Sequence, residues 1–511
     1  MDKLIVTATI LLMWVCCTVA VPQKNRKKLE VLLVTAPSPG HLIKMAALGE
    51  ELVTRGHKVI LSTTEREGSE LPQKLANDYG MSFLSAGPDD LNSETFIEYQ
   101  KLLHAKSVFG SVLTSAQVIY PGWANHTANV LDNCPFKNWD VVVVEQYMSP
   151  TFACYTKKWK IPMIVLRTTL DFRLHHLPPW SFPLLTTGYA ENLTFVERLV
   201  LVFYRLAFYY LETVFVNSQL KLGGDECMTA YYHAVAAGGT STPLIIGTAF
   251  GFEFARPVLP LIHYVGPLFP KAHEVFPDAL QTWLDNKHPK TLIYISMGST
   301  ASLTPSMGKA ILDGILGTEY DAVWSLRKNN RDILEGLTIN TSRFFISEWV
   351  PQRVLLENDR IAMFIGHGGM GGVTESLRNS LPVIVIPFNS DQWDTAARIK
   401  AQGLGIVLNR NYLTSSDITV AVEALKSAKY VQMAKKMSKI FHFAGGTKKA
   451  ADLVEYYVDV GYEHLVPATS EHQWNWIEFY NIEADVYALT LLGLLIFVCC
   501  CLKIYLSFVA R

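Results

Sequence analysis

The sequence lacks both a charge imbalance and the cysteine content of a disulfide-built protein. Its 511 residues carry a net charge of −1 and contain no block of basic side chains, which argues against nucleic acid as a partner. Of the 8 cysteines, five lie in apolar stretches near the chain ends, which leaves Cys134, Cys154 and Cys227. Three cysteines allow at most one internal disulfide, so apolar cores must hold the fold, and the length is sufficient for two domains.

Two binding signatures are also missing. The chain contains no HxH, DxD or HExxH arrangement, so we expect neither a metal site nor another bound cofactor. No GxGxxG turn follows the first apolar strand of either half, which disfavours a dinucleotide-dependent oxidoreductase. The sequence also has no short-period repeat and no low-complexity tract.

Apolar stretches at both ends of the chain predict targeting and membrane anchoring. Leu4–Val15 is short and is followed by small residues, which is typical of a signal peptide over 1–20. The stretch 486–507 is long enough to span a bilayer, for which about 20 apolar residues are needed, with Lys503 able to snorkel. Acidic residues precede it and Arg511 follows it, so the pattern predicts a type I membrane protein. The juxtamembrane segment is then 471–485 and the cytosolic tail 508–511.

Three Asn-X-Ser/Thr sequons lie in the part of the chain that this topology places in the lumen. They are Asn125, Asn192 and Asn340, and each is a candidate glycosylation site. Each is also a short motif that arises readily by chance.

Alternating apolar strands and amphipathic helices predict an α/β fold built in two halves. The first half begins with a strand at 29–35, a helix at 42–54 and a strand at 58–62, which together form one βαβ unit. A second series of the same kind starts with a strand at 291–296. Further strands are expected at 140–144, 161–166, 321–326, 344–346 and 361–365.

The stretch 349–392 combines a strand, a glycine turn and a helix. The apolar run Ile361–Ile365 ends in Gly366-His367-Gly368-Gly369, after which an apolar-periodic helix begins. Glycines let the backbone approach a phosphate, and the unpaired N–H groups and dipole at the helix start hold the anion. The next strand, 382–387, is followed by Asp391 and Gln392. Ligands of parallel sheets bind beyond the carboxyl ends of the strands, so His367 and Asp391 should face one crevice.

The order and spacing of ten residues in this stretch carry a family resemblance. They are Trp349, Gln352, His367, Gly368, Gly369, Glu375, Pro382, Pro387, Asp391 and Gln392. Together they resemble the donor-binding signature of the UDP-glycosyltransferases, membrane-anchored animal enzymes that move a sugar from UDP to small lipophilic acceptors. The resemblance implies the GT-B fold, in which two Rossmann-like domains with doubly wound parallel sheets face each other across a cleft. It places an acceptor-binding domain at 21–265 and a UDP-sugar-binding domain at 266–470.

The resemblance also implies that His41 is the catalytic base and that a carboxylate supports it. His41 opens a helix, whose dipole disfavours the imidazolium by about 0.3–1 kcal/mol and so favours the neutral base. Glu145 follows the strand 140–144 at the same edge of the predicted sheet, where it can hold the imidazole tautomer. The vertebrate pattern has Asp at this position, so Glu145 is a departure from it. Asp140 and His57 are expected to be structural.

The other matched residues are expected to surround the UDP-sugar. Trp349 offers a face for stacking uracil, Gln352 an amide for the base edge, and Glu375 a carboxylate for the ribose hydroxyls. The diphosphate is expected among Ser299, His367, Gly368, Gly369 and Gly372, and the sugar against Asp391 and Gln392.

Differences from the family pattern leave the sugar open. Gly366, Ser390 and Thr395 replace residues that are common in the family. No Arg or Lys adjoins the Asp391-Gln392 pair before Arg398, so we expect a neutral hexose, with glucose favoured and glucuronate or galactose as alternatives. A second hypothesis, from another class, is a catalytically silent membrane protein that binds lipophilic ligands or UDP-sugars.

The resemblance further implies an endoplasmic-reticulum membrane protein with lumenal catalytic domains. The tail from Lys503 to Arg511 contains no dilysine retrieval signal, so the plasma membrane remains the alternative address. Homo-oligomerisation is left open by the sequence.

Overall fold

A computed structural model describes most of the chain between residues 27 and 466. The described residues are 27–65, 69–88, 139–146, 148, 149, 152, 156, 159–167, 188, 189, 193–201, 242–256, 258–271, 274–298, 301, 303–388, 391–466, 490, 493–496 and 498. The predicted signal peptide and most of the predicted transmembrane helix therefore lie outside the described residues, as do Ser299, Asn125 and Asn192. Within the described residues, no helix combines the length and the apolarity that a membrane crossing needs.

Seven parallel strands form the first sheet, in the order β3-β2-β1-β4-β5-β6-β7. They are β1 (Glu30–Val34), β2 (Lys58–Glu65), β3 (Ser82–Pro88), β4 (Val141–Glu145), β5 (Met163–Arg167), β6 (Leu244–Ile246) and β7 (Ile262–Tyr264). The strands predicted in this half are confirmed, and β4 includes Glu145 as its last residue. Side chains alternate along β1, so Val31 and Leu33 enter one core while Leu32 and Val34 enter the core on the opposite face.

Six parallel strands form the second sheet, in the order β10-β9-β8-β11-β12-β13. They are β8 (Leu292–Ser296), β9 (Asp321–Ser325), β10 (Phe344–Ser347), β11 (Ile361–Gly366), β12 (Val383–Val385) and β13 (Gly405–Val407). Leu292 and Tyr294 of β8 pack on one face, where Tyr294 stacks with Phe364, and Ile293 and Ile295 pack on the other. Both sheets are thus buried on two faces, as expected for doubly wound parallel sheets.

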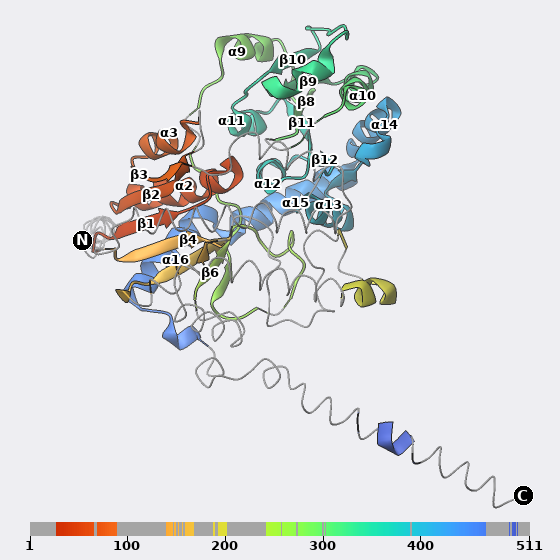
Figure 1. Cartoon of the computed structure of the whole chain (residues 1–511). Helices are drawn as coiled ribbons and strands as arrows, with labels where there is room; N and C mark the ends of the chain where they lie inside the picture. Colours follow the sequence, from red (N-terminus) through yellow and green to blue (C-terminus); the bar gives the residue numbers. More distant parts are fainter. Residues whose placement is uncertain are drawn as a thin grey trace, which may run out of the picture.

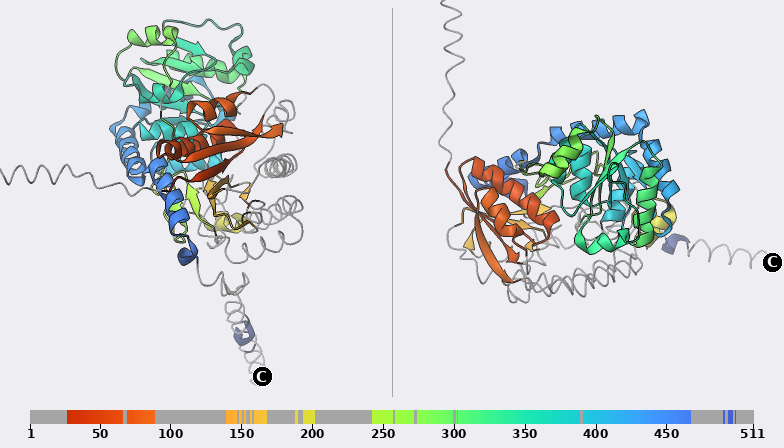
Figure 2. Two further views of the ribbon diagram at one scale, coloured as in Figure 1. Left: turned by 90° about the vertical axis from the view of Figure 1, so that its left-hand side faces the viewer. Right: turned by 90° about the horizontal axis from the view of Figure 1, so that it is seen from above.

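Helices connect the strands and cover both sheets, which lie in two separate halves of the molecule (Figures 1 and 2). The α-helices are α2 (Pro39–Thr54), α3 (Leu71–Asp78), α9 (Asp278–Asp285), α10 (Pro305–Leu316), α11 (Gln352–Glu357), α12 (Met370–Arg378), α13 (Gln392–Ala401), α14 (Ser415–Leu425), α15 (Ala428–Ala444) and α16 (Gly446–Asp459). Short 3-10 turns lie at Lys328–Leu334, Arg410–Tyr412 and Glu463–Leu465.

The helix α16 lies within the range predicted for the second domain but packs against the first sheet (Figure 1). Its apolar face places Leu453, Val454 and Tyr457 in the same core as α2. At its other face, Glu455 accepts a hydrogen bond from Arg55 at 3.1 Å and lies 2.9 Å from Nε2 of His57. His57 therefore has a structural role, as predicted. It joins the end of the first βαβ unit to α16.

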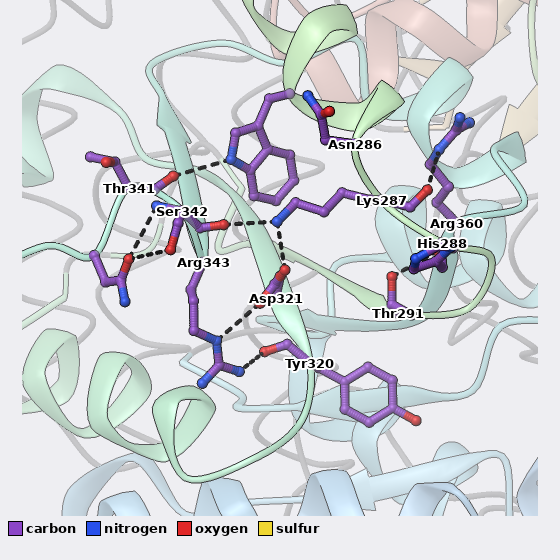
Figure 3. A network of polar contacts seen from close by, with 12 residues as sticks. Asn286, Lys287, His288, Thr291, Tyr320, Asp321, Thr341, Ser342, Arg343 and Arg360 are labelled. Carbon is purple, nitrogen blue, oxygen red and sulfur yellow. Dashed lines mark hydrogen bonds and ion pairs between the residues drawn. The ribbon is translucent and has the colours of Figure 1, made fainter.

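A polar network fixes the amino ends of strands in the second sheet (Figure 3). Asp321, the first residue of β9, accepts from Lys287 at 2.6 Å and from Arg343 at 2.9 Å. Lys287 also donates to the backbone carbonyl of Ser342 at 2.7 Å. The sequon residue Asn340 is exposed in the same region, where its side-chain oxygen accepts from Ser342. These contacts join residues at the amino ends of the strands. Ligands of parallel sheets bind at the opposite, carboxyl ends.

Candidate functional site

Two neighbouring strands bring His41 and Glu145 together. β1 pairs with β4, so the turn after β1 and the last residue of β4 meet at the carboxyl edge of the first sheet. His41 lies in the first turn of α2, and its Nδ1 is 3.2 Å from Oε1 of Glu145. The Glu145 side chain is 1% exposed and that of His41 is 19% exposed. Because an ionised carboxylate only accepts hydrogen bonds, this contact suits the imidazole tautomer with its proton on Nδ1 and its basic lone pair on Nε2.

The glycine turn after β11 is shaped around the ring of His367. A Cβ atom at Gly298 would lie 2.4 Å from that ring, and one at Gly369 would lie 2.5 Å from it. Gly368 has a φ of +91°, and a Cβ there would lie 2.8 Å from Val385. These positions therefore require glycine, and the turn leads directly into α12, whose amino end is free to face an anion.

Burial sets the charge state of His367. It lowers the pKa of the imidazole to about 4, so the ring is neutral near pH 7. The one N–H of the neutral imidazole is taken up by a hydrogen bond to the backbone of Ser296, so His367 adds no full positive charge to the site. The amino end of α12 is then the principal source of positive potential on this side of the turn.

Two of the three predicted nucleotide-binding residues are hydrogen-bonded to each other. Trp349 is 53% exposed and so presents a large apolar surface at the carboxyl edge of β10. Gln352 donates from Nε2 to Oε2 of Glu375 at 2.6 Å, and its Oε1 accepts from the Tyr294 hydroxyl at 3.2 Å. Burial raises the pKa of Glu375, and the Gln352 hydrogen bond opposes that shift. The structure thus places the amide and the carboxylate side by side, as binding of one nucleoside requires.

Asp391 connects the second domain electrostatically to the first. It stands at the N-cap of α13, after the carboxyl end of β12. Burial raises its pKa, while His41 and then Lys44, both on α2, oppose the shift. The predicted catalytic base on α2 therefore acts electrostatically on the carboxylate that is predicted to hold the sugar.

The side chain of Gln392, unlike that of Asp391, is hydrogen-bonded to the backbone of its own loop. Its side chain is buried, and its Oε1 accepts from the backbone amide of Phe388 at 2.8 Å. Its backbone oxygen also lies against Gly368, within 3.2 Å of where a Cβ would stand. Gln392 thus ties the loop before α13 to the glycine turn after β11.

A buried ion pair sets the position of α13 relative to the first domain. Arg398 donates to Oε2 of Glu253 from Nε at 3.1 Å and from Nη2 at 2.9 Å, and both side chains are at most 3% exposed. Arg256 lies 3.7 Å from the same oxygen. Arg398, the first basic residue after the Asp391-Gln392 pair, therefore forms an ion pair with Glu253 at the domain interface.

Sequence reasoning missed Lys44. This residue lies one helical turn after His41 and is 5% exposed. Burial lowers its pKa to about 8, and the carboxylates of Asp391, Glu375 and Glu145 act in the opposite direction. The i, i+3 spacing from His41 was the signal that could have placed it on the same helix face.

The described residues contain no group of three or more His, Cys, Asp or Glu side chains arranged to hold a metal ion. Asp140 is structural, since its Oδ2 accepts from the backbone amide of Glu30 at 2.9 Å and its Oδ1 pairs with Lys27 at 2.6 Å.

Solved structures with the same arrangement define the class of the fold. The calicheamicin glycosyltransferase CalG4 superposes with a TM-score of 0.59 over 85% of this chain and 99% of its own, at 18% identity. UGT89C1 of Arabidopsis thaliana, solved with UDP, gives a TM-score of 0.59 over 85% and 100%, at 17% identity. The two parallel-sheet α/β domains therefore have the GT-B fold of glycosyltransferases.

The family model for UDP-glucoronosyl and UDP-glucosyl transferase matches residues 30–511. The chain belongs to this family and is a UDP-glycosyltransferase. Among curated relatives, UDP-glucuronosyltransferase 2B7 of Homo sapiens is 22% identical over 518 residues, which cover 94% of each chain. UDP-glucuronosyltransferase 2C1 of Oryctolagus cuniculus is 27% identical over 340 residues, which cover 63% of this chain and 64% of its own.

Proposed function

We propose that this protein transfers a neutral hexose, glucose first, from a UDP-sugar to a hydroxyl of a small lipophilic acceptor with inversion at the anomeric carbon. The observation that carries the proposal is the pair of His41 and Glu145, whose Nδ1 and Oε1 atoms lie 3.2 Å apart, and His41 also acts on the pKa of Asp391 in the second domain. A base on one side of the cleft and a sugar-binding carboxylate on the other is the arrangement that a single displacement needs.

The proposed reaction begins at the acceptor hydroxyl. Nε2 of His41 takes its proton, while Nδ1–H donates to Glu145, whose carboxylate stabilises the imidazolium that forms. The acceptor oxygen forms a bond to the anomeric carbon as the bond from that carbon to the UDP oxygen breaks. UDP leaves with the electron pair, and the configuration inverts because attack comes from the face opposite to UDP.

The second domain would bind the UDP-sugar and stabilise the negative charge that develops on the departing UDP. The amino end of α12, with Gly368 and Gly369, would offer backbone N–H groups to the diphosphate, and the neutral ring of His367 would pack beside them. Trp349, Gln352 and Glu375 would bind the nucleoside, with the exposed indole against uracil. Gly372 lies in the first turn of α12, and Ser299 and Gln392 remain proposed donor contacts.

The charges around the proposed sugar position favour a neutral hexose over glucuronate. Asp391, Glu375 and Glu145 all act on the ammonium of Lys44, Arg353 also acts on Glu375, and Arg398 is paired with Glu253. A sugar carboxylate would add a fourth acid to this set of described groups, which disfavours glucuronate. Galactose remains an alternative because it carries no charge.

We also propose that the chain is anchored as a type I protein of the endoplasmic reticulum, by the apolar stretch 486–507, with both domains in the lumen and glycans at Asn125, Asn192 and Asn340. The apolarity of that stretch and the exposure of Asn340 support this assignment. Imaging of the full-length protein tests it, and plasma-membrane staining would contradict the address.

Incubation of the full-length protein with radiolabelled UDP-glucose, UDP-galactose and UDP-glucuronate and a panel of phenols tests the proposed function. We expect glucoside formation with inverted anomeric configuration, and transfer from UDP-glucose at least about tenfold faster than from UDP-glucuronate, a difference of about 1.4 kcal/mol. UDP-sugar binding without transfer to any acceptor would instead support a catalytically silent binder. Retained configuration in the product would exclude the single displacement.

A further inference from the structure

Three polar side chains form a line along one face of α13. Asp394, Arg398 and Gln402 stand at positions i, i+4 and i+8, and residues with this spacing are neighbours on a helix surface. Ala396 and Ile399 of the same helix pack in the apolar core of the second sheet. The helix therefore belongs to the second domain by its apolar residues and carries a separate polar line, which consists of these three side chains.

Both ends of the polar line are hydrogen-bonded to the backbone of the first domain. Oδ1 of Asp394 accepts from the amide of Gly188 at 3.0 Å. Nε2 of Gln402 donates to the carbonyl of Phe252, which follows β6 of the first sheet, at 2.7 Å. Two segments of the first domain thus contact the same face of α13.

The centre of the polar line is a buried ion pair. Arg398 donates from Nε and from Nη2 to Oε2 of Glu253, and its Nη1 donates to the carbonyl of Asp394 in its own helix at 3.1 Å. The guanidinium also lies over the ring of Phe254, 4.9 Å from the ring centroid. A buried guanidinium with this many directional contacts has one defined position, and loss of a partner leaves a buried charge unpaired.

The segment that carries Glu253 is itself inserted into the second domain. It lies between β6 and β7 of the first sheet, yet Ala249 and Phe252 pack in the core of the second sheet. The ring of Phe252 is 6.0 Å from that of Phe441 on α15. Withdrawal of this segment would open a close-packed core, so Glu253 is a fixed point against which α13 is held.

The helix α13 connects this fixed point to the proposed sugar contacts. Asp391 is the N-cap of α13 and Gln392 its first residue, and Asp391 precedes Arg398 by about two turns, or about 10 Å along the helix axis. The proposed nucleoside contacts, Gln352 and Glu375, lie on α11 and α12 and are hydrogen-bonded to each other. A shift of α13 would therefore move the sugar contacts and leave the nucleoside contacts in place.

We propose that Glu253 of the first domain is a positioning residue of the donor site: it holds Arg398 and thereby places α13, with Asp391 at its N-cap, against the sugar of the UDP-sugar. This inference rests on the proposed function, because it uses the assignment of Asp391 to the sugar. It adds that the first domain sets how the sugar fits into the second domain.

Titration of the full-length protein with UDP and with UDP-glucose, in the absence of an acceptor, tests the inference. Arg398→Met removes the ion pair, and we expect it to weaken UDP-glucose binding about tenfold while UDP binds as in wild type. Arg398→Lys should recover part of the loss, because its ammonium keeps the charge but not the fork of donors. A difference between the two ligands is a result that a general loss of stability would not give.

Two further variants complete the comparison. Gln402→Met removes one bond between the domains without leaving a buried charge, and it should weaken UDP-glucose by about threefold and UDP not at all. Arg343→Met is the matched control, because Arg343 also donates to a carboxylate and to backbone carbonyls, but at the amino end of the second sheet. It should lower the unfolding temperature and leave both affinities unchanged. If Arg398→Met fails to fold, Arg398→Lys and Gln402→Met decide the matter.

Titration of Asp391→Asn with the same two ligands separates this inference from the proposed function. If Asp391→Asn weakens UDP-glucose but the Arg398 and Gln402 variants do not, the positioning role of Glu253 is overturned and the sugar assignment stands. Equal weakening of UDP and UDP-glucose by the Arg398 variants also overturns that role. If Asp391→Asn binds UDP-glucose as wild type does, the assignment of Asp391 to the sugar fails, and this inference fails with it.

Discussion

The two ends of the second sheet hold their carboxylates in different ways. At the amino end, the carboxylate of Asp321 lies between Lys287 and Arg343 (Figure 3). At the carboxyl end, burial is the largest influence on the pKa of Asp391 and of Glu375. Burial raises the pKa of both Asp391 and Glu375, so their ionised forms destabilise the folded state. One end of the same sheet is therefore arranged for stability, and the other for a ligand.

The largest expected effect removes the base that faces the carboxyl end. His41→Ala should reduce sugar transfer about 10²- to 10⁴-fold, the usual contribution of a positioned base. UDP affinity should stay near the wild-type value, because His41 belongs to the acceptor side. Single-turnover transfer and UDP titration measure the two quantities. Transfer at the wild-type rate to an ordinary hydroxyl would remove His41 from the mechanism.

Asp391→Asn should separate function from stability. Transfer should fall about 10- to 100-fold through loss of charge-assisted bonds to the sugar, while UDP, which lacks the sugar, should bind as before. The free energy of unfolding at neutral pH should rise, because the folded pKa of Asp391 is raised and its ionised form disfavours the folded state. The gain should shrink as the pH falls below that raised pKa and vanish only near the unfolded-state value for aspartate, about 3.9.

Urea denaturation of wild type and Asp391→Asn at neutral and acidic pH measures the stability difference. Destabilisation by Asp391→Asn, together with equal weakening of UDP and UDP-glucose, would mean that the N-cap of α13 supports the fold rather than the sugar.

Glu145→Gln should have a smaller effect than the loss of His41. The imidazole remains in place, but the counter-charge for its protonated form is lost, so we expect transfer to fall about tenfold. The pH profile of kcat/KM should change with it, because the carboxylate no longer supports proton uptake. Activity equal to wild type across the profile would show that another carboxylate serves the base.

Asp321→Ala tests the opposite end of the sheet and should have the smallest effect on transfer. The residue joins Lys287 and Arg343, but all three side chains are 14–24% exposed, so we expect a loss of about 1 kcal/mol in unfolding free energy. Donor kinetics should not change. Asp313→Ala, which breaks the exposed pair with Lys309, is the control and should cost less. A large loss of sugar transfer in Asp321→Ala would contradict the assignment of a structural role to the amino end of the second sheet and of a ligand-binding role to its carboxyl end.

The parts of the fold and site that local sequence determines were predictable. The strand β11, its glycine turn and α12 are continuous in the chain. Glycine follows His367 at two positions because the φ of Gly368 is positive and the His367 ring lies close to the backbone of Gly369. The pairing of His41 with Glu145 also followed, because adjacent parallel strands bring their carboxyl ends to one edge.

Contacts between distant segments were not predictable in this way. A lysine on an amphipathic helix ordinarily indicates the solvent face, yet Lys44 is buried, and acids that follow it by more than three hundred residues act on its pKa. Arg398 likewise has a partner, Glu253, that belongs to the other domain. Charge pairs of this kind depend on how the two domains dock, and no local period in the sequence records that.

The return of α16 to the first sheet has a consequence for how the chain is made. Leu453, Val454 and Tyr457 fill a core whose strands were completed almost two hundred residues earlier in synthesis. Until the chain reaches α16, that face of the first sheet is open, so the first half must leave the ribosome with an unfinished apolar surface. Termination just before residue 446 would therefore leave the second domain with all its strands and the first domain, although made earlier, without its last helix.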